Sequence, residues 1–88
     1  MFKKKLLLAL AALMLALPAL ATEVNQASQA ELERIKGIGP TLSDKILDER
    51  AKSEFKDWDD LMARVKGMGA RSSRRLSDAG LTVNGGLW

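Results

Sequence analysis

Two short segments of the chain combine glycines with a basic side chain in a pattern that can bind an anion. Each segment reads Lys-Gly-hydrophobic-Gly, from Lys36 to Gly39 and again from Lys66 to Gly69. Glycines permit a tight reversal of the chain with positive φ, and they let another backbone approach without a Cβ in the way. A helix that begins directly after such a turn presents free N–H groups and the positive end of its dipole. The chemistry predicted here is non-covalent binding of phosphate groups by backbone amides.

The two segments belong to an internal repeat. Residues 32–46 return thirty residues later as residues 62–76, with Arg, Lys, both glycines and one Ser at matching positions. Two copies of one small helical unit, each unable to bury its own apolar face, are expected to pack into one core. Within each copy, Ile38 or Met68 should plug the turn into that core. Ser43 and Ser73 should allow the two helices of each copy to cross closely.

Two helices are predicted to position the first turn. Ser28, followed three residues later by Glu31, forms a capping box at the start of the first helix. The glycines should end that helix. Pro40 suits the first turn of the second helix, where its missing N–H costs nothing, and this helix should run to about Ala51.

A matching pair of helices is predicted around the second turn. Asp57 can cap a third helix, and a fourth should run from about Ala70 to Ala79. Gly80 suits the left-handed conformation after a helix end. Apart from the brief segment 81–83, nothing alternates like a strand. The fold class expected is therefore all-α, a domain of four short helices in two hairpins.

The N-terminal residues predict export. Three lysines at positions 3–5 precede an apolar run over residues 6–17, and an Ala-Leu-Ala sequence ends at Ala21. This arrangement is typical of a cleavable signal peptide, and the run is shorter than the roughly 20 residues that span a membrane. We expect a mature protein that begins at Thr22 and has no membrane anchor. An uncleaved N-terminal anchor is the alternative.

The charge and the missing residue types exclude several functions. Of the 14 Lys and Arg residues, three lie in the predicted signal peptide, so 11 remain against 11 Asp and Glu. The mature chain is formally neutral, but residues 61–77 hold five basic residues and no acidic one. Without Cys or His, the chain has no disulfide, no thiolate metal site and no thiol nucleophile. Because Asp59 and Asp60 point to different sides of a helix, they indicate capping rather than metal binding. We expect no catalysis, no metal and no cofactor.

The paired turns resemble the helix-hairpin-helix motif, in which a hydrophobic-Gly-hydrophobic-Gly turn precedes a helix with a small and then an aliphatic residue. The chain is similar to the competence DNA-receptor (ComEA) family over about residues 23–83. The similarity lies in the tandem arrangement, the lead-in 24–28, the connector 55–58 and the closing residues 81–83. This resemblance implies an exported, periplasmic protein that binds double-stranded DNA during natural transformation. The chain departs from the common pattern at Ala70, where Pro is usual, and at Ser73, where Ala is usual.

The expected function is sequence-independent binding of double-stranded DNA, since contacts to phosphates carry no sequence information. The backbone amides of the glycines, and of Thr41 and Arg71 beyond them, should donate to phosphate oxygens, while basic side chains add charge. We expect a signal peptide over 1–21, a tandem helix-hairpin-helix domain over 22–83 with motifs 29–51 and 58–79, and a flexible tail over 84–88. The residues expected to bind DNA are Lys36, Gly37, Ile38, Gly39, Thr41, Lys45, Lys66, Gly67, Met68, Gly69, Arg71, Arg74 and Arg75.

A second hypothesis gives the same scaffold a different partner. The acidic second helix and the connector offer charge for a basic protein, and an exposed Trp88 offers an anchor, so the chain would be an envelope protein-interaction module. The placement of the basic residues in 64–75 discriminates between the two. One face shared with both glycine turns favours DNA, and the envelope DNA-uptake machinery is then the expected protein partner. Scattered positions favour a protein-interaction module.

Overall fold

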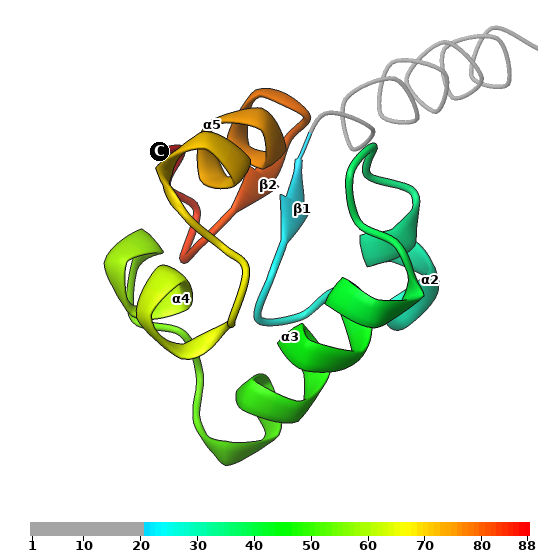
Figure 1. Ribbon diagram of the computed structural model, residues 1–88, viewed down its shortest axis with the longest axis vertical. Coiled ribbons are helices and arrows are strands. Elements are labelled where there is room, and N and C mark those ends of the chain that lie inside the picture. Colours follow the sequence, from blue (N-terminus) through cyan, green and yellow to red (C-terminus); the bar gives the residue numbers. More distant parts are fainter. Residues whose placement is uncertain (1–20) are drawn as a thin grey trace, which may run out of the picture.

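The computed structural model of the protein describes residues 21–88, so the predicted signal peptide lies outside the described residues except for Ala21. Figure 1 shows two helical hairpins side by side, with a short ladder of strands between them. The four predicted helices are confirmed, and none of the described helices is long and apolar enough to cross a membrane. The elements are β1 (Thr22–Glu23), α2 (Gln29–Glu33), α3 (Pro40–Lys52), α4 (Trp58–Arg64), α5 (Ala70–Asp78) and β2 (Leu81–Thr82).

Side-chain caps start the first helix of each hairpin. The Ser28 hydroxyl accepts a hydrogen bond from the Glu31 N–H at 3.1 Å, and the Glu31 carboxylate accepts one from the Ser28 N–H at 3.0 Å. The capping box is thus confirmed. In α4, the Asp57 carboxylate accepts from the Asp60 N–H at 2.8 Å, as predicted. These caps satisfy amides that a helix start leaves without an internal partner.

The two glycines of each turn have different backbone conformations. Gly37 and Gly67 have φ of 106° and 93°, in the left-handed region that favours glycine. Gly39 and Gly69 have φ of −95° and −111° and are the N-caps of α3 and α5. The expectation of positive φ is therefore right for the first glycine of each pair and wrong for the second. The amides at the starts of α3 and α5 therefore have no side-chain acceptor, because a glycine N-cap has no side chain that could accept a hydrogen bond.

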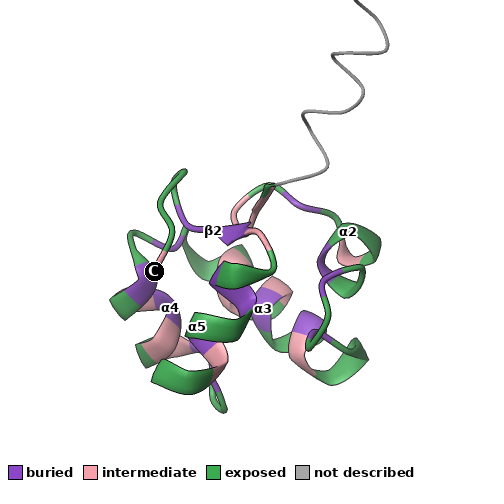
Figure 2. Ribbon diagram, turned by 90° about the horizontal axis from the view of Figure 1, so that it is seen from above, coloured by how far each residue is buried: buried purple, intermediate pink, exposed green. Residues whose placement is uncertain are grey.

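Both hairpins contribute to one core, as the repeat predicted. Equivalent positions are buried in the two copies, including Ile38 with Met68 and Ile46 with Leu76. Figure 2 shows the buried segments facing the middle of the domain and the exposed ones facing outward. The core cluster of the described residues runs from Val24 to Val83, so a protein that begins at Thr22 retains all of it.

A two-residue parallel ladder joins the ends of the helical domain and adds a small sheet to the expected all-α fold. Thr22 pairs with Leu81 and Glu23 with Thr82. The sequence contained too little alternation to reveal it, because strands this short carry no periodic signal. Partial burial raises the pKa of Glu23, but hydrogen bonds from the N–H groups of Gly85 and its neighbours outweigh that effect and lower the pKa.

The segment 84–88, where we expected a flexible tail, packs on the second hairpin. The Trp58 indole N–H donates to the Gly86 carbonyl at 2.9 Å, and the Trp88 N–H donates to the Ser77 hydroxyl at 2.8 Å. The Arg74 guanidinium lies 5.1 Å from the centre of the Trp88 ring. Trp88 is half-buried against the core, so the expectation that it is exposed is wrong.

Candidate nucleic-acid interface

The first turn (residues 36–39) and the start of α3 offer unused backbone donors. Within residues 21–88, the N–H groups of Gly37, Gly39 and Thr41 have no hydrogen-bond acceptor, and all three residues are exposed. A helix start has no carbonyls one turn earlier to accept these hydrogen bonds. The partial positive charge at this end of α3 adds to their attraction for an anion.

The second turn (residues 66–69) repeats this geometry. The N–H groups of Gly67, Gly69 and Arg71 likewise have no acceptor in the described part of the chain, and the three residues are exposed. An ideal Cβ built on Gly67 or Gly69 would meet no atom within 4 Å. The surface beside these amides is therefore open to another molecule.

The hydrophobic residue of each turn faces the core instead. Ile38 is 3% exposed and Met68 is 5% exposed. Their N–H groups donate within the turn, to the carbonyls of Ile35 at 3.0 Å and Val65 at 3.2 Å. Ile38 and Met68 thus plug the turns as predicted, and their N–H groups are already paired. In the structure these two residues position the turns.

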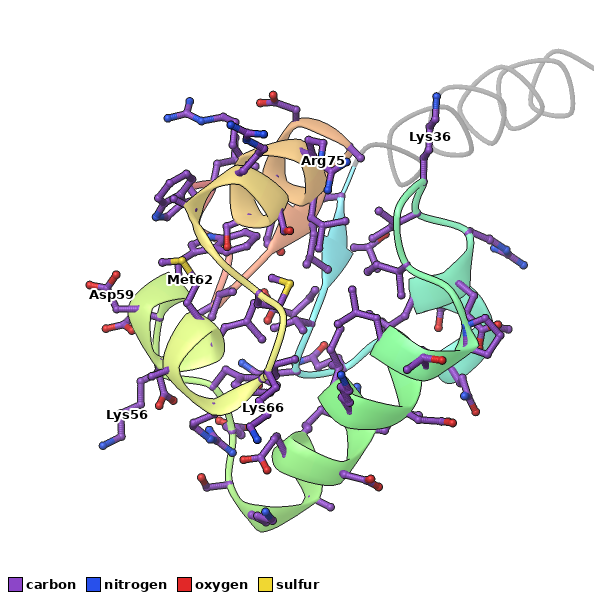
Figure 3. The ribbon with its side chains drawn as sticks, viewed as in Figure 1. Lys36, Lys56, Asp59, Met62, Lys66 and Arg75 are labelled. Atoms are coloured by element: carbon purple, nitrogen blue, oxygen red, sulfur yellow. The ribbon has the colours of Figure 1, made fainter. Side chains whose placement is uncertain are left out.

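Both helix starts border one groove. Its lining includes Lys36 and Gly37 of the first turn on one side and Arg75 and Leu76 of α5 on the other. Leu42 in the first turn of α3 and Ser72 in the first turn of α5 also line it. Figure 3 shows Lys36 extending from the first turn and Arg75 on the side of α5 that faces the first hairpin. Of the free amides, that of Gly37 borders this groove, whereas Gly67, Gly69 and Arg71 do not line it, and the acidic residue Asp78 does.

The second turn has the same relation to the opposite hairpin. The Lys45 ammonium lies 3.5 Å from the Lys66 carbonyl, and both residues line a second, smaller depression. A shift of thirty residues converts Lys36 into Lys66 and Arg75 into Lys45. Each turn thus packs beside the second helix of the other hairpin, and the sequence repeat becomes a repeat in space.

The basic side chains fall into two groups. Lys36, Lys45, Lys66, Arg71, Arg74 and Arg75 are exposed, and none forms an ion pair within the described residues. Arg64 differs, because its guanidinium stacks on Phe55 at 4.5 Å and donates to the carbonyls of Glu49, Ser53 and Glu54. Arg64 stabilises the connector and leaves the exposed cations near the turns as the charge available to an anion.

One comparison with known proteins identifies the family. The model of the helix-hairpin-helix motif matches residues 21–78. The chain belongs to the helix-hairpin-helix family. Such motifs are commonly nucleic-acid binding. No curated protein and no solved structure matches the chain.

Five residues that line the groove of this helix-hairpin-helix domain were not among the DNA-binding residues expected from the sequence. They are Leu42, Ser72, Leu76, Asp78 and Ala79. A signal for two of them was present, since Leu42 and Ser72 are equivalent positions of the repeat and each lies three residues after its N-cap glycine. In residues 21–88, no group of three or more Asp or Glu side chains is arranged to hold a metal ion.

Proposed function

We propose that this helix-hairpin-helix protein binds double-stranded DNA through its phosphates, without reading base sequence. The observation that carries the proposal is that both glycine turns expose unpaired backbone amides, and that the first turns of the two following helices line one groove. Each set lies at the positive end of a helix, where a phosphate is favoured. Hydrogen bonds from backbone N–H groups to phosphate oxygens fix a protein on the duplex, but they do not distinguish one base pair from another.

The proposed setting is the periplasm. The basic and apolar residues before Ala21 support export by a signal peptide, and the resemblance to the competence DNA-receptor family supports a role in DNA uptake during natural transformation. In this proposal the protein is not an enzyme and needs no cofactor. Double-stranded DNA is its main ligand, and the envelope DNA-uptake machinery receives the DNA from it.

The arrangement of charge favours DNA over a protein partner. Arg75 lines a groove with Lys36, and Lys45 lies beside Lys66, so each turn has a cation of the other hairpin next to it. Asp78 also lines the groove, and Asp48 and Glu49 line the smaller depression. A protein-interaction module would have gained an exposed aromatic anchor from Trp88. That side chain is half-buried and covered on one side by Arg74.

The test is a titration of a fluorescent random-sequence duplex with purified protein that begins at Thr22, followed by fluorescence anisotropy. Six exposed cations lie near the turns. If all six contact phosphates, the slope of log K against log salt concentration should be about −5. Binding should be equal for duplexes of different sequence. No binding at low salt, or binding that salt leaves unchanged, contradicts the proposal.

Charge-matched variants locate the site. Lys66→Ala and Arg74→Ala should each weaken binding and flatten the salt slope by about one unit, because each removes one phosphate contact. Lys56→Ala removes the same charge from an exposed residue before α4 that lines neither the groove nor the smaller depression. Lys56→Ala should leave the slope unchanged. Equal effects of all three variants would mean that net charge alone drives binding.

A further inference from the structure

The two hairpins carry unequal charge at equivalent positions. Residues 34–48 contain three basic and two acidic residues, whereas residues 64–78 contain five basic and one acidic. At the second residue of the helix, α3 has Thr41 where α5 has Arg71. One turn further on, α3 has Asp44 where α5 has Arg74. All four side chains are exposed.

The negative charge on α3 is not neutralised inside the protein. The Asp44 carboxylate accepts a hydrogen bond from the Gln29 side-chain amide at 2.7 Å, which carries no charge. Within residues 21–88, Asp44 forms no ion pair. It follows the free amide of Thr41 by three residues, which is well within the Debye length of about 10 Å at 0.1 M salt. A phosphate bound at the start of α3 therefore experiences repulsion from this carboxylate.

The positive charges on α5 are likewise not neutralised by ion pairs within the described residues. Arg71, Arg74 and Arg75 are exposed, and none pairs with a carboxylate in the described part of the chain. Stacking on the Trp88 ring holds the Arg74 guanidinium beside α5 without removing its charge. The backbone donors of the two turns are alike, so the difference between the hairpins lies in these side chains.

We propose that the two hairpins contribute unequally to DNA binding, and that Thr41 and Asp44 set the affinity below the value that the fold allows. This inference rests on the proposed function. The second hairpin supplies most of the electrostatic attraction, and the first contributes mainly its backbone amides. A duplex can then leave the first hairpin while the second still holds it, which suits a protein that passes DNA on.

The experiment exchanges residues between equivalent positions and measures anisotropy titrations at several salt concentrations. Thr41→Arg should bind the duplex about tenfold more tightly near 0.1 M salt and steepen the salt slope by about one unit, as expected for one added phosphate contact. Arg71→Thr should have the opposite effect of the same size. Asp44→Asn keeps the oxygen that accepts from Gln29 and should tighten binding about twofold, through the loss of repulsion alone.

A matched control separates position from net charge. Glu54→Gln also removes one negative charge, but Glu54 is exposed, forms no ion pair among the described residues and lines neither the groove nor the smaller depression. Binding by Glu54→Gln should equal that of the wild type. Circular dichroism of each variant confirms that the helices remain, since all substituted positions are exposed.

The possible outcomes distinguish this inference from the proposed function. Tighter binding by Thr41→Arg and Asp44→Asn, but not by Glu54→Gln, supports the inference. If the wild type binds and Arg71→Thr weakens binding, while Thr41→Arg and Asp44→Asn act like the wild type, the first hairpin does not contact phosphate and the inference is wrong. Equal tightening by Asp44→Asn and Glu54→Gln also overturns it. A wild type that does not bind duplex DNA overturns the proposed function itself.

Discussion

In the first hairpin, polar side chains join α2 to α3 around the buried Ser43. Its hydroxyl donates to the Glu33 carboxylate at 2.9 Å and accepts from the Gln29 amide at 3.0 Å. The second hairpin has no such network, and the equivalent hydroxyl of Ser73 is buried without a partner among the described residues. Ala63 stands where the first hairpin has Glu33. The two hairpins thus share a backbone but are stabilised by different side chains.

At the arginine that precedes each turn, the second hairpin has the side-chain contacts that the first hairpin lacks. Arg64 donates to the carbonyl of Glu49 in α3 and to the carbonyls of Ser53 and Glu54 directly after α3, and it forms ion pairs with Glu49 and Asp60. Arg34, its equivalent in the first hairpin, is exposed and makes no side-chain hydrogen bond within residues 21–88. The features common to both copies are the turn glycines, the buried hydrophobic plug and the free amides. Conversely, the contacts that hold each hairpin together differ between the copies.

The largest expected effect comes from the glycine at the tightest point of each turn. Gly37→Val should lower the free energy of unfolding by about 3 kcal/mol and Gly67→Val by about 2 kcal/mol, because a β-branched residue resists positive φ. The first loss is larger because a Cβ at Gly37 would lie 3.3 Å from Leu76, whereas one at Gly67 meets nothing within 4 Å. Urea denaturation followed by circular dichroism measures both values.

The second glycine of each turn provides the control. Gly39 and Gly69 have negative φ and open space around an added Cβ. Replacing either with Ala should change the free energy of unfolding by no more than about 1 kcal/mol. A Gly67→Val protein that is folded and binds DNA as the wild type does would contradict the role of the turn geometry in binding.

The arginine pair is expected to show the next largest difference. Arg64→Ala should destabilise the protein by about 2 kcal/mol, because it leaves the carbonyls of Glu49, Ser53 and Glu54 without their donor. It also removes the side chain that stacks on Phe55. Arg34→Ala removes an exposed side chain and should cost no more than about 0.5 kcal/mol. Thermal or urea unfolding checks both. Equal losses would show that the contacts of Arg64 are replaced by water at little cost.

The geometry of the two turns was predictable where both copies of the repeat agree. Two glycine turns, each followed by a helix start, were sufficient to predict the free amides and the shared core. The β1–β2 ladder and the packing of Trp88 depend on contacts between distant segments, which no local pattern encodes. The burial of Ile38 and Met68 was also predictable, from their place between the two glycines of each turn.

The smallest effect concerns the two buried serines and gives opposite signs at equivalent positions. Ser43→Ala should lower the free energy of unfolding by about 1 kcal/mol, since it removes a bonded hydroxyl from the network with Glu33 and Gln29. Ser73→Ala should raise it by about 0.5 kcal/mol, because a buried hydroxyl without a partner is unfavourable and a methyl group is not. Parallel urea titrations resolve the sign. If Ser73→Ala lowers the free energy of unfolding as much as Ser43→Ala does, the Ser73 hydroxyl has a hydrogen-bond partner in solution. The helix–helix contacts within the two hairpins would then be stabilised alike.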